Sequence, residues 1–347
     1  MKNINIFLEE MPQENLNEYL IEKTCQKYRT KQLLKYLIQG VPSIDDMSSL
    51  PLSLREQLKK DFRYASVAVE KEYRSAIDDT VKFLFRLYDG YCIEGVLMKY
   101  DYGYSVCISS QAGCKMGCKF CASSHVDFSR NLTAHEMLRQ VYLMSKTAGD
   151  RIGNVVIMGV GEPFDNYENI ITFLKLVHQE EGFNIGYRKI TVSTCGIVPR
   201  IYDFAKEELP VNLSVSLHAP NDELRVKVMP IAKKWSVDDI VKACKAYIKA
   251  TGRRITFEYA LIEGFNADKK HAYMLVDLIK GLLCHINLIP VNGIGESSYK
   301  KPDQQVIKTF FGILQNSGIP VSIRRELGSD INAACGQLRK MDMESEI

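Results

Sequence analysis

The sequence predicts an α/β protein built on an incomplete (β/α)6 barrel, with a small helical domain at its N-terminus. From residue 154 onward, short apolar stretches typical of strands alternate with amphipathic stretches typical of helices, a pattern that favours parallel strands joined by right-handed crossovers. Six or seven such units are too few for a closed eight-stranded barrel. We therefore expect a barrel that is open on one side and can admit a macromolecule.

Three parts follow one another along the chain. Residues 1–75 have apolar positions at helical spacing, broken at Gly40 and Pro42 and again at Pro51, and predict a helical accessory domain. Residues 76–106 alternate as strands do, with turns at Asp89-Gly90 and near Gly103, and predict a β-hairpin extension leading into the barrel. Residues 107–340 contain the partial barrel and a C-terminal loop.

Individual elements of the barrel can be placed. Thr133 and Glu136 form a capping-box pattern that opens a helix extending to about Thr147, where Gly149 can end it. The expected strands are residues 154–159, 189–195, 211–219, 254–262, 285–292 and 320–327, and the expected helices are residues 166–180, 197–208, 236–250, 268–281 and 302–316.

Composition excludes several classes of protein. Lys and Arg number 45 against 42 Asp and Glu, so an RNA partner would have to be met by local basic patches. The sequence has no apolar segment of membrane-spanning length, and its N-terminus lacks a signal-peptide core. We expect a soluble cytoplasmic monomer. Ten scattered cysteines then suit a reducing compartment, and Cys25, Cys92, Cys195, Cys244 and Cys284 are interpreted as small buried residues.

Three other cysteines stand close together. Cys114, Cys118 and Cys121 are spaced by four and then three residues, and Gly113 and Gly117 allow the loop to curl around one centre. Crowded thiolates repel one another unless a cation neutralises them. The residues alone leave two alternatives: a zinc ion with a fourth ligand such as His125, or an iron–sulfur cluster with one iron open to a ligand.

Polar residues also follow the predicted strands. They are Gly161 and Glu162, Ser193, Ser216 to His218 with Leu217 between them, and Asn292. In parallel α/β barrels the C-terminal strand ends form the active site, so these residues predict one. The glycines would let the backbone approach a small ligand, and Glu162 could accept a charge-assisted hydrogen bond. Past the last strand, nearby arginines favour the thiolate form of Cys335.

The cysteine spacing, with an aromatic residue before Cys121, resembles the signature of the radical S-adenosylmethionine (SAM) enzymes. The stretches CISSQAGCKMGCKFCASS, RNLT, MGVGEP, VSLHAPND, NLIPVN and SDINAACGQL are similar, in this order, to the RlmN/Cfr family of RNA adenosine methyltransferases. The resemblance covers nearly the whole chain. It implies a radical SAM barrel, a [4Fe–4S] cluster on Cys114, Cys118 and Cys121, and SAM bound by the strand-end residues named above.

The resemblance also implies a reaction. One SAM methylates Cys335, and a second is reductively cleaved to a radical that takes a hydrogen atom from the S-methyl group. The carbon radical adds to the adenine ring. Cys107 then attacks the sulfur of Cys335 to form a transient disulfide, while Glu94 accepts the ring proton. An external one-electron reductant supplies electrons.

The implied substrates are RNA. The family's C2 branch methylates an adenosine of 23S ribosomal RNA in the peptidyl transferase centre and, in some members, the adenosine beside the tRNA anticodon, whereas the C8 branch confers antibiotic resistance. The C-terminal half resembles the C2 branch, but residues 123–127 depart from its usual pattern and leave C8 as the alternative. Candidate phosphate contacts are Lys115, Lys119, Arg130, Arg188, Lys189, Lys300 and Lys301, although for each of them ordinary solvated surface charge is the favoured explanation.

Overall fold

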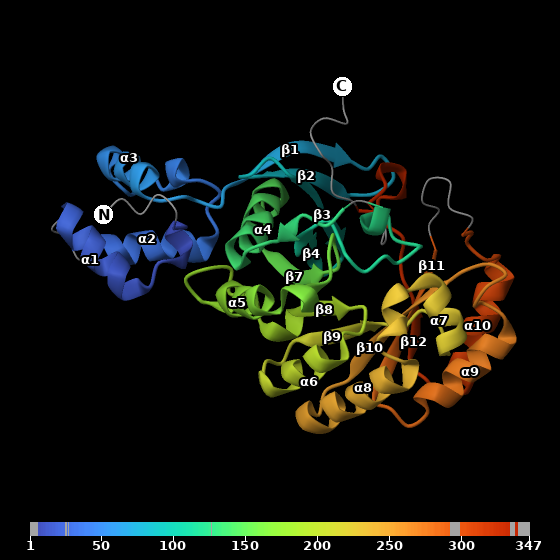
Figure 1. The fold of residues 1–347 in the computed structure, drawn as a ribbon. Coiled ribbons are helices and arrows are strands. Elements are labelled where there is room, and N and C mark those ends of the chain that lie inside the picture. Colours follow the sequence, from blue (N-terminus) through green and yellow to red (C-terminus); the bar gives the residue numbers. More distant parts are fainter. Residues whose placement is uncertain are drawn as a thin grey trace.

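The structure, a computed structural model, describes residues 6–24, 26, 28–125, 127–291, 299–333 and 337–338. Within these ranges no helix is both long and apolar enough to span a bilayer. The chain forms one curved sheet with helices on its outer face, and a small helical unit extends from one side (Figure 1).

The N-terminal unit consists of α1 (Gln13–Thr24), α2 (Tyr28–Gln39) and α3 (Leu52–Asp61), with short 3-10 turns at Leu8–Glu10 and Ile44–Asp46. Leu33 and Leu37 on α2 are one helical turn apart and bury the same face. They belong to a separate apolar core that also contains Leu8, Leu16, Leu20, Val41, Ile44, Met47, Leu50, Leu54, Leu58 and Phe62.

The helical pattern does not continue to residue 75 as predicted. Residues Val67–Arg74 form strand β1, which pairs with β2 (Val81–Leu87). Its side chains are mostly exposed and include Glu70, Lys71 and Glu72, so the strand lacks the apolar alternation by which the other strands were recognised. Charged residues are typical of an edge strand, where they discourage pairing with other chains.

Ten strands form the main sheet, in the order β1-β2-β3-β4-β7-β8-β9-β10-β11-β12. Strands β1 to β4, with β3 at Cys92–Tyr100 and β4 at Gly103–Ile108, are antiparallel and include the predicted hairpin. From β4 onward neighbours are parallel: β7 (Ile152–Ile157), β8 (Ile190–Thr194), β9 (Asn212–Ser216), β10 (Ile255–Leu261), β11 (Cys284–Pro290) and β12 (Val321–Ile323). Because β1 and β12 are edges, the barrel is incomplete, as predicted.

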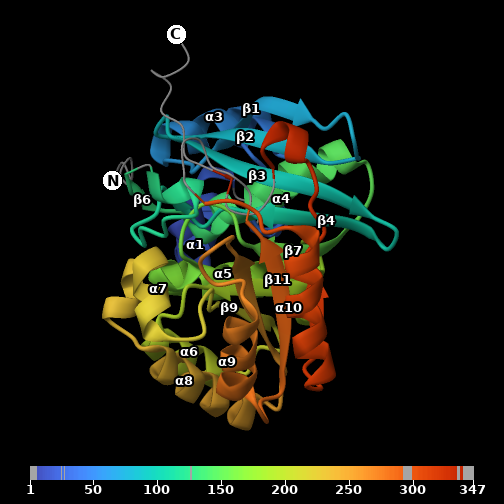
Figure 2. The same cartoon turned by 90° about the vertical axis from the view of Figure 1, so that its right-hand side faces the viewer.

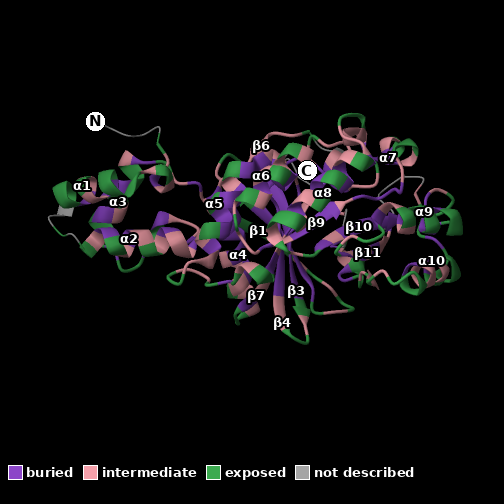
Figure 3. Ribbon diagram, turned by 90° about the horizontal axis from the view of Figure 1, so that it is seen from below, coloured by how far each residue is buried: buried purple, intermediate pink, exposed green. Residues whose placement is uncertain are grey.

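Helices cover the outside of the parallel strands (Figure 2). They are α4 (Ala134–Ala148), α5 (Tyr167–His178), α6 (Val198–Lys206), α7 (Asp222–Val228), α8 (Val237–Thr251), α9 (Lys269–Ile279) and α10 (Gln304–Asn316). Of these, the short helix α7 was not predicted. The helices turn apolar faces toward buried strands and exposed faces toward solvent (Figure 3).

A buried ion pair joins the helical unit to the barrel. Arg139 on α4 lies 2.7 Å from the Glu9 carboxylate, and its other donors bond the carbonyls of Val41 and Ala65 at 3.1 and 2.7 Å. Both side chains are almost fully buried, so neither charge has water as an alternative partner.

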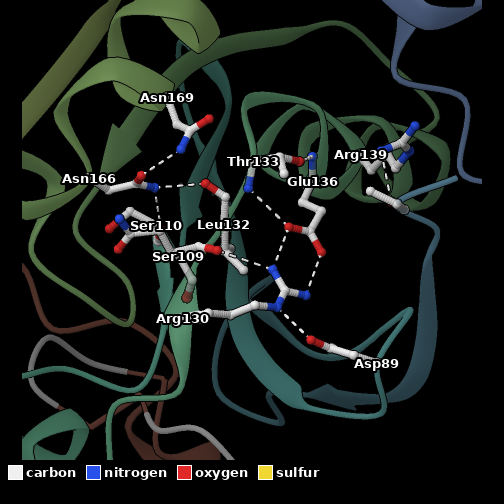
Figure 4. A network of polar contacts seen from close by, with 12 residues as sticks. Asp89, Ser109, Ser110, Arg130, Leu132, Thr133, Glu136, Arg139, Asn166 and Asn169 are labelled. Atoms are coloured by element: carbon white, nitrogen blue, oxygen red, sulfur yellow. Dashed lines mark hydrogen bonds and ion pairs between the residues drawn. The ribbon is translucent and has the colours of Figure 1, made fainter. Parts of the chain in front are cut away.

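Helix α4 begins with the predicted capping box (Figure 4). The Thr133 hydroxyl accepts the backbone N–H of Glu136 at 3.1 Å, and the Glu136 carboxylate accepts the N–H of Thr133 at 3.0 Å. The same carboxylate receives two hydrogen bonds of 2.8 Å from Arg130, which also pairs with Asp89. Four groups therefore fix the start of the helix that follows the cysteine loop.

We predict that Thr133→Ala lowers the free energy of unfolding by about 1 kcal/mol, because the backbone N–H of Glu136 loses its side-chain acceptor. Denaturant unfolding followed by circular dichroism measures this change. Thr172→Ala is the matched control: Thr172 is exposed inside α5 and only bonds the carbonyl of Glu168, so its removal should change stability by less than about 0.5 kcal/mol. Equal losses in both variants would contradict the capping role.

Candidate functional site

A hollow of about 970 Å³ lies at the C-terminal ends of the parallel strands. One wall is the cysteine loop, and the other consists of residues that follow or end β7, β8, β9, β10 and β11. Its lining includes Cys114, Cys118, Cys121, Gly161, Glu162, Ser193, Ser216 and His218, all of which were predicted from sequence. A partly enclosed hollow with a mostly apolar lining and a few polar groups suits a small ligand.

The cysteine loop runs between the two-residue strand β5 (Gln111–Ala112) and the 3-10 turn Ala122–His125. Gly113 has φ +83°, and a Cβ there would lie 2.1 Å from the carbonyl oxygen of Asp127. Gly117 has φ +69°, so both glycines are needed for the curled path. The loop is fastened to α7 by a 2.9 Å hydrogen bond from Lys119 N–H to the Val228 carbonyl.

The three thiols are half-buried and share surroundings that disfavour the thiolate form. Burial, assisted by the charges of Glu162 and Cys121, raises the pKa of Cys114 to about 12. Burial also raises the pKa of Cys118, and the charges of the two neighbouring thiols raise it further. Burial likewise raises the pKa of Cys121. Thiolates at these positions therefore require a bound cation to stabilise them.

The three cysteines are not gathered into a closed single-ion site in the part of the chain that the structure describes. Among the residues that the structure describes, no three His, Cys, Asp or Glu side chains are grouped closely enough to hold one metal ion. The three cysteines instead border one hollow from different points of the loop. The side chain of His125, the alternative zinc ligand, lies outside the described residues.

Glu162 holds two strand ends together. One carboxylate oxygen accepts the backbone N–H of Phe164 at 2.9 Å, and the other accepts that of Cys195, at the end of β8, at 2.7 Å. Burial raises the pKa of Glu162, and these hydrogen bonds oppose the rise. Side-chain hydrogen bonds from Thr194 and Cys195 also reach this carboxylate, which borders the hollow.

The glycines beside Glu162 have a packing reason in addition to the ligand approach that was predicted. A Cβ on Gly159 would lie 2.7 Å from the carbonyl oxygen of Ile108, and one on Gly161, at φ +108°, would lie 2.6 Å from Cβ of Gln111. Close packing of the 159–162 loop on the segment after β4 therefore requires these glycines. Approach of a ligand is not needed to explain them.

Ser193 on β8 and Ser216 on β9 line the hollow, and His218 follows them. The ring nitrogen Nδ1 of His218 accepts the N–H of Ala260 at 2.9 Å, so the proton resides on Nε2. Burial, with Arg225 as a lesser cause, lowers the pKa of His218 to about 3 and keeps the ring neutral near pH 7. Leu217 differs from its neighbours, because its side chain is buried in the main core.

The remaining predicted site residues lie on the antiparallel extension or beyond it. Cys107 on β4 is paired with Val96 on β3 and packs in an apolar cluster with Ala333 and Leu338. Asn292 and Cys335 lie outside the described residues, but Ala333 and Leu338 are two positions before and three positions after Cys335. The structure thus brings Cys107 to the described residues on both sides of that cysteine.

Glu94 is buried rather than solvent-facing. Its carboxylate lies 3.0 Å from Nζ of Lys82, with the two side chains 1% and 8% exposed. Strand register puts Lys82, Val96 and Cys107 directly opposite one another, so Glu94, two residues from Val96, shares their face of the sheet. This agrees with the predicted proximity of Glu94 and Cys107.

Sequence reasoning missed several polar residues. Lys82 was hidden inside an apolar strand, and Glu258, which lines the hollow from β10, was hidden in the same way. Glu258 accepts a 3.1 Å hydrogen bond from Asn287, and Arg324 lies 3.8 Å away. The sequence did offer a signal for both residues: a charged side chain at an inward-facing strand position is seldom buried without a partner or a function.

Three of the proposed phosphate contacts are already paired. Arg130 bonds Glu136 and Asp89, Lys115 lies 3.1 Å from Asp165, and Lys301 lies 3.1 Å from Glu326. Arg130 is part of the α4 cap and is therefore structural. The other two pairs are largely exposed and can exchange partners at small cost.

An open parallel barrel with a three-cysteine loop beside its strand ends defines the radical SAM class of proteins. The family model of the radical SAM superfamily matches residues 108–276. A crystal structure of a radical SAM methyltransferase from Sphaerobacter thermophilus superposes with a TM-score of 0.90 at 41% identity, covering 96% of this chain and 99% of that one.

Full-length relatives narrow the class to one family. "Probable dual-specificity RNA methyltransferase RlmN" from Clostridium botulinum (strain Eklund 17B / Type B) is 49% identical over 333 residues, 96% of each chain. The protein of the same name from Clostridium acetobutylicum is 50% identical over 329 residues, 95% of each chain. The chain belongs to the RlmN family of radical SAM methyltransferases.

We predict that Gly161→Ala lowers the free energy of unfolding by more than about 1 kcal/mol, because its φ of +108° and the contact with Gln111 both exclude a Cβ. Gly312→Ala is the matched control: Gly312 lies in α10 with open space around a Cβ, so alanine should be neutral or stabilising by about 0.4–1 kcal/mol. Denaturant unfolding compares them. An unaffected Gly161 variant would mean that the 159–162 loop is looser than its packing indicates.

Proposed function

We propose that the protein is a radical SAM methyltransferase that methylates C2 of an adenosine in 23S ribosomal RNA and of the adenosine next to the anticodon in tRNA. The single observation that supports this most strongly is the shared hollow between the three-cysteine loop and the strand ends, in a chain half identical over 96% of its length to RNA methyltransferases. We infer that it acts as a cytoplasmic monomer with an external one-electron reductant.

Cys114, Cys118 and Cys121 would hold a [4Fe–4S] cluster. Three soft sulfur donors that border one hollow suit such a cluster and leave one iron open to SAM. When bound and reduced, the cluster supplies the electron that cleaves SAM.

The strand-end residues would hold SAM in the rest of the hollow. Glu162 places a buried carboxylate at the hollow, and a carboxylate can take the ammonium group of SAM in a charge-assisted hydrogen bond. Ser193 and Ser216 offer hydroxyl groups, and Nε2 of neutral His218 offers a donor. Gly161, Leu217 and Asn292 would contribute backbone or neighbouring contacts, an assignment that rests on the family resemblance.

Three residues would handle the RNA. Cys335 would carry the methyl group, Cys107 would attack its sulfur after transfer to adenine, and Glu94 would accept the ring proton. The packing of Cys107 against Ala333 and Leu338, and the register that sets Glu94 on the same face as Cys107, support this assignment. The disulfide that forms is cleared by the external reductant.

RNA specificity follows from the family rather than from single contacts. An adenosine flipped out of its stack could enter through the open side of the barrel, with basic loops near the mouth holding phosphates. Relatives named for the RlmN activity favour C2, and the departure at residues 123–127 is the feature that keeps C8 as the outcome to exclude.

We predict that Cys335→Ala abolishes methyl transfer while SAM cleavage continues, because the carrier is lost but the cluster is not. Methylated product and 5′-deoxyadenosine are measured separately by mass spectrometry. Cys244→Ala, at a buried cysteine of the main core, is the control and should keep both activities. Full methylation by the Cys335 variant would show that Cys335 does not carry the methyl group.

We predict that Cys107→Ala leaves the protein covalently joined to RNA, because no thiol releases the adduct from Cys335. A shifted band on a denaturing gel that disappears with ribonuclease detects the adduct. A Cys107 variant that turns over without a crosslink would show that another group resolves the intermediate.

Nucleoside analysis tests the target atom. Ribosomal RNA and tRNA from cells with and without the protein should differ in 2-methyladenosine, identified by mass spectrometry against synthetic standards. 8-Methyladenosine in its place would assign the chain to the C8 reaction.

A further inference from the structure

Arg225 is a fully buried cation close to the cysteine loop. Its Nε donates to the carbonyl of Leu217 at 3.1 Å, and Nη2 donates to the carbonyls of Cys195 and Ser216 at 2.6 and 3.2 Å. Nη1 is buried and has no hydrogen-bond partner among the described residues. Within the same part of the chain no carboxylate lies within 4 Å of the guanidinium.

Arg139, another fully buried arginine, has a carboxylate partner. Arg139 is equally buried, but the carboxylate of Glu9 lies 2.7 Å from it. A buried guanidinium with only carbonyl partners keeps its full positive charge in a medium of low dielectric constant, which is costly unless an anion compensates it. Arg225 therefore lacks an ion-pair partner among the described residues of the chain.

The cysteine loop packs against the helix that carries Arg225. Helix α7, which carries Arg225, accepts the Lys119 N–H through the Val228 carbonyl at 2.9 Å. Val228 and Met229 pack in one cluster with Cys118 and Cys195. Burial lowers the pKa of Arg225, while negative charge at Cys195 and Cys118 would raise it, as does the carboxylate of Asp222 on the same helix, which makes no ion pair with it.

We propose that Arg225 is the fixed positive charge that compensates the anionic iron–sulfur cluster and raises its reduction potential. This inference depends on the cluster assigned above to Cys114, Cys118 and Cys121. A cluster held by three thiolates is anionic and gains a further negative charge on reduction, so a nearby cation stabilises the reduced form more than the oxidised form. The buried position keeps solvent and salt from screening this effect.

A purely structural role is the competing explanation. Three hydrogen bonds from one guanidinium tie together the ends of β8 and β9, and losing them alone could disturb the site. The two explanations differ in what a charge-retaining substitution does. Lysine keeps the charge and loses the forked hydrogen bonds, whereas glutamine keeps amide donors and loses the charge.

The experiment uses the full chain, reconstituted anaerobically with iron and sulfide. Arg225→Lys and Arg225→Gln are compared with the unmodified protein by iron and sulfide content and by a redox titration monitored by electron paramagnetic resonance without SAM. We expect the midpoint potential of Arg225→Gln to shift to more negative values and that of Arg225→Lys to stay near the original. Arg253→Gln is the matched control, because Arg253 also bonds the Val211 carbonyl and the Asn212 amide oxygen but lies at the start of β10.

Each outcome separates the explanations. An unchanged potential in a loaded Arg225→Gln protein, or equal shifts in the glutamine and lysine variants, would overturn the charge-compensation role. If the glutamine variant binds no cluster, the lysine variant is the test. The charge-compensation role then requires that Arg225→Lys binds the cluster with a midpoint potential near that of the unmodified protein. If it does not, only the structural role remains. An unmodified protein that takes up no iron and sulfide would instead contradict the proposed function.

Discussion

A buried network of hydrogen bonds fastens the loops after β4 and β7 to each other, and every part of the candidate site depends on it. Gln111, just before the cysteines, accepts the N–H of Glu162 at 2.8 Å and donates to Asn131 and Asp165 at 2.8 and 2.9 Å. Glu162 extends the network to the end of β8. Because these hydrogen bonds join Gln111 to backbone and side-chain groups on three neighbouring segments, the wall of the hollow is set before any ligand arrives.

The same fastening continues to the start of α4. Asn166, after the 159–162 loop, donates to the carbonyls of Ser110 and Leu132 at 2.9 and 2.8 Å (Figure 4). Leu132 directly precedes the Thr133 cap. The cysteine loop is thus held at its N-terminal end by Gln111, at its C-terminal end by the α4 cap, and in its middle by α7. A loop of many polar and glycine residues becomes a fixed ligand set through its neighbours rather than through its own conformation.

Sequence patterns predicted much of this arrangement because the strongest signals are local. The capping box at Thr133, the turns of the hairpin and the alternation of parallel strands each depend on residues close in sequence. Strand β1 and helix α7 were missed because one is a charged edge strand and the other has seven residues, too few to show a period. The close approach of Gly161 to Gln111 brings together residues that are 50 positions apart, and no local sequence pattern reveals such a contact.

Long-range contacts also decide how the C-terminal segment reaches the extension. Asp330 accepts hydrogen bonds of 2.7 Å from the Ser75 hydroxyl and the Ala76 N–H, and Asp78 accepts the N–H of Gly328 at 2.9 Å. Farther on, Ser123 in the turn after Cys121 donates to the Leu338 carbonyl at 2.7 Å. The segment is therefore attached both to the β1–β2 turn and to the cysteine loop. Strand β4 pairs with both the hairpin and the barrel, so one continuous sheet links the two places where the segment is attached. Moving the β1–β2 turn relative to the cysteine loop would therefore deform that sheet.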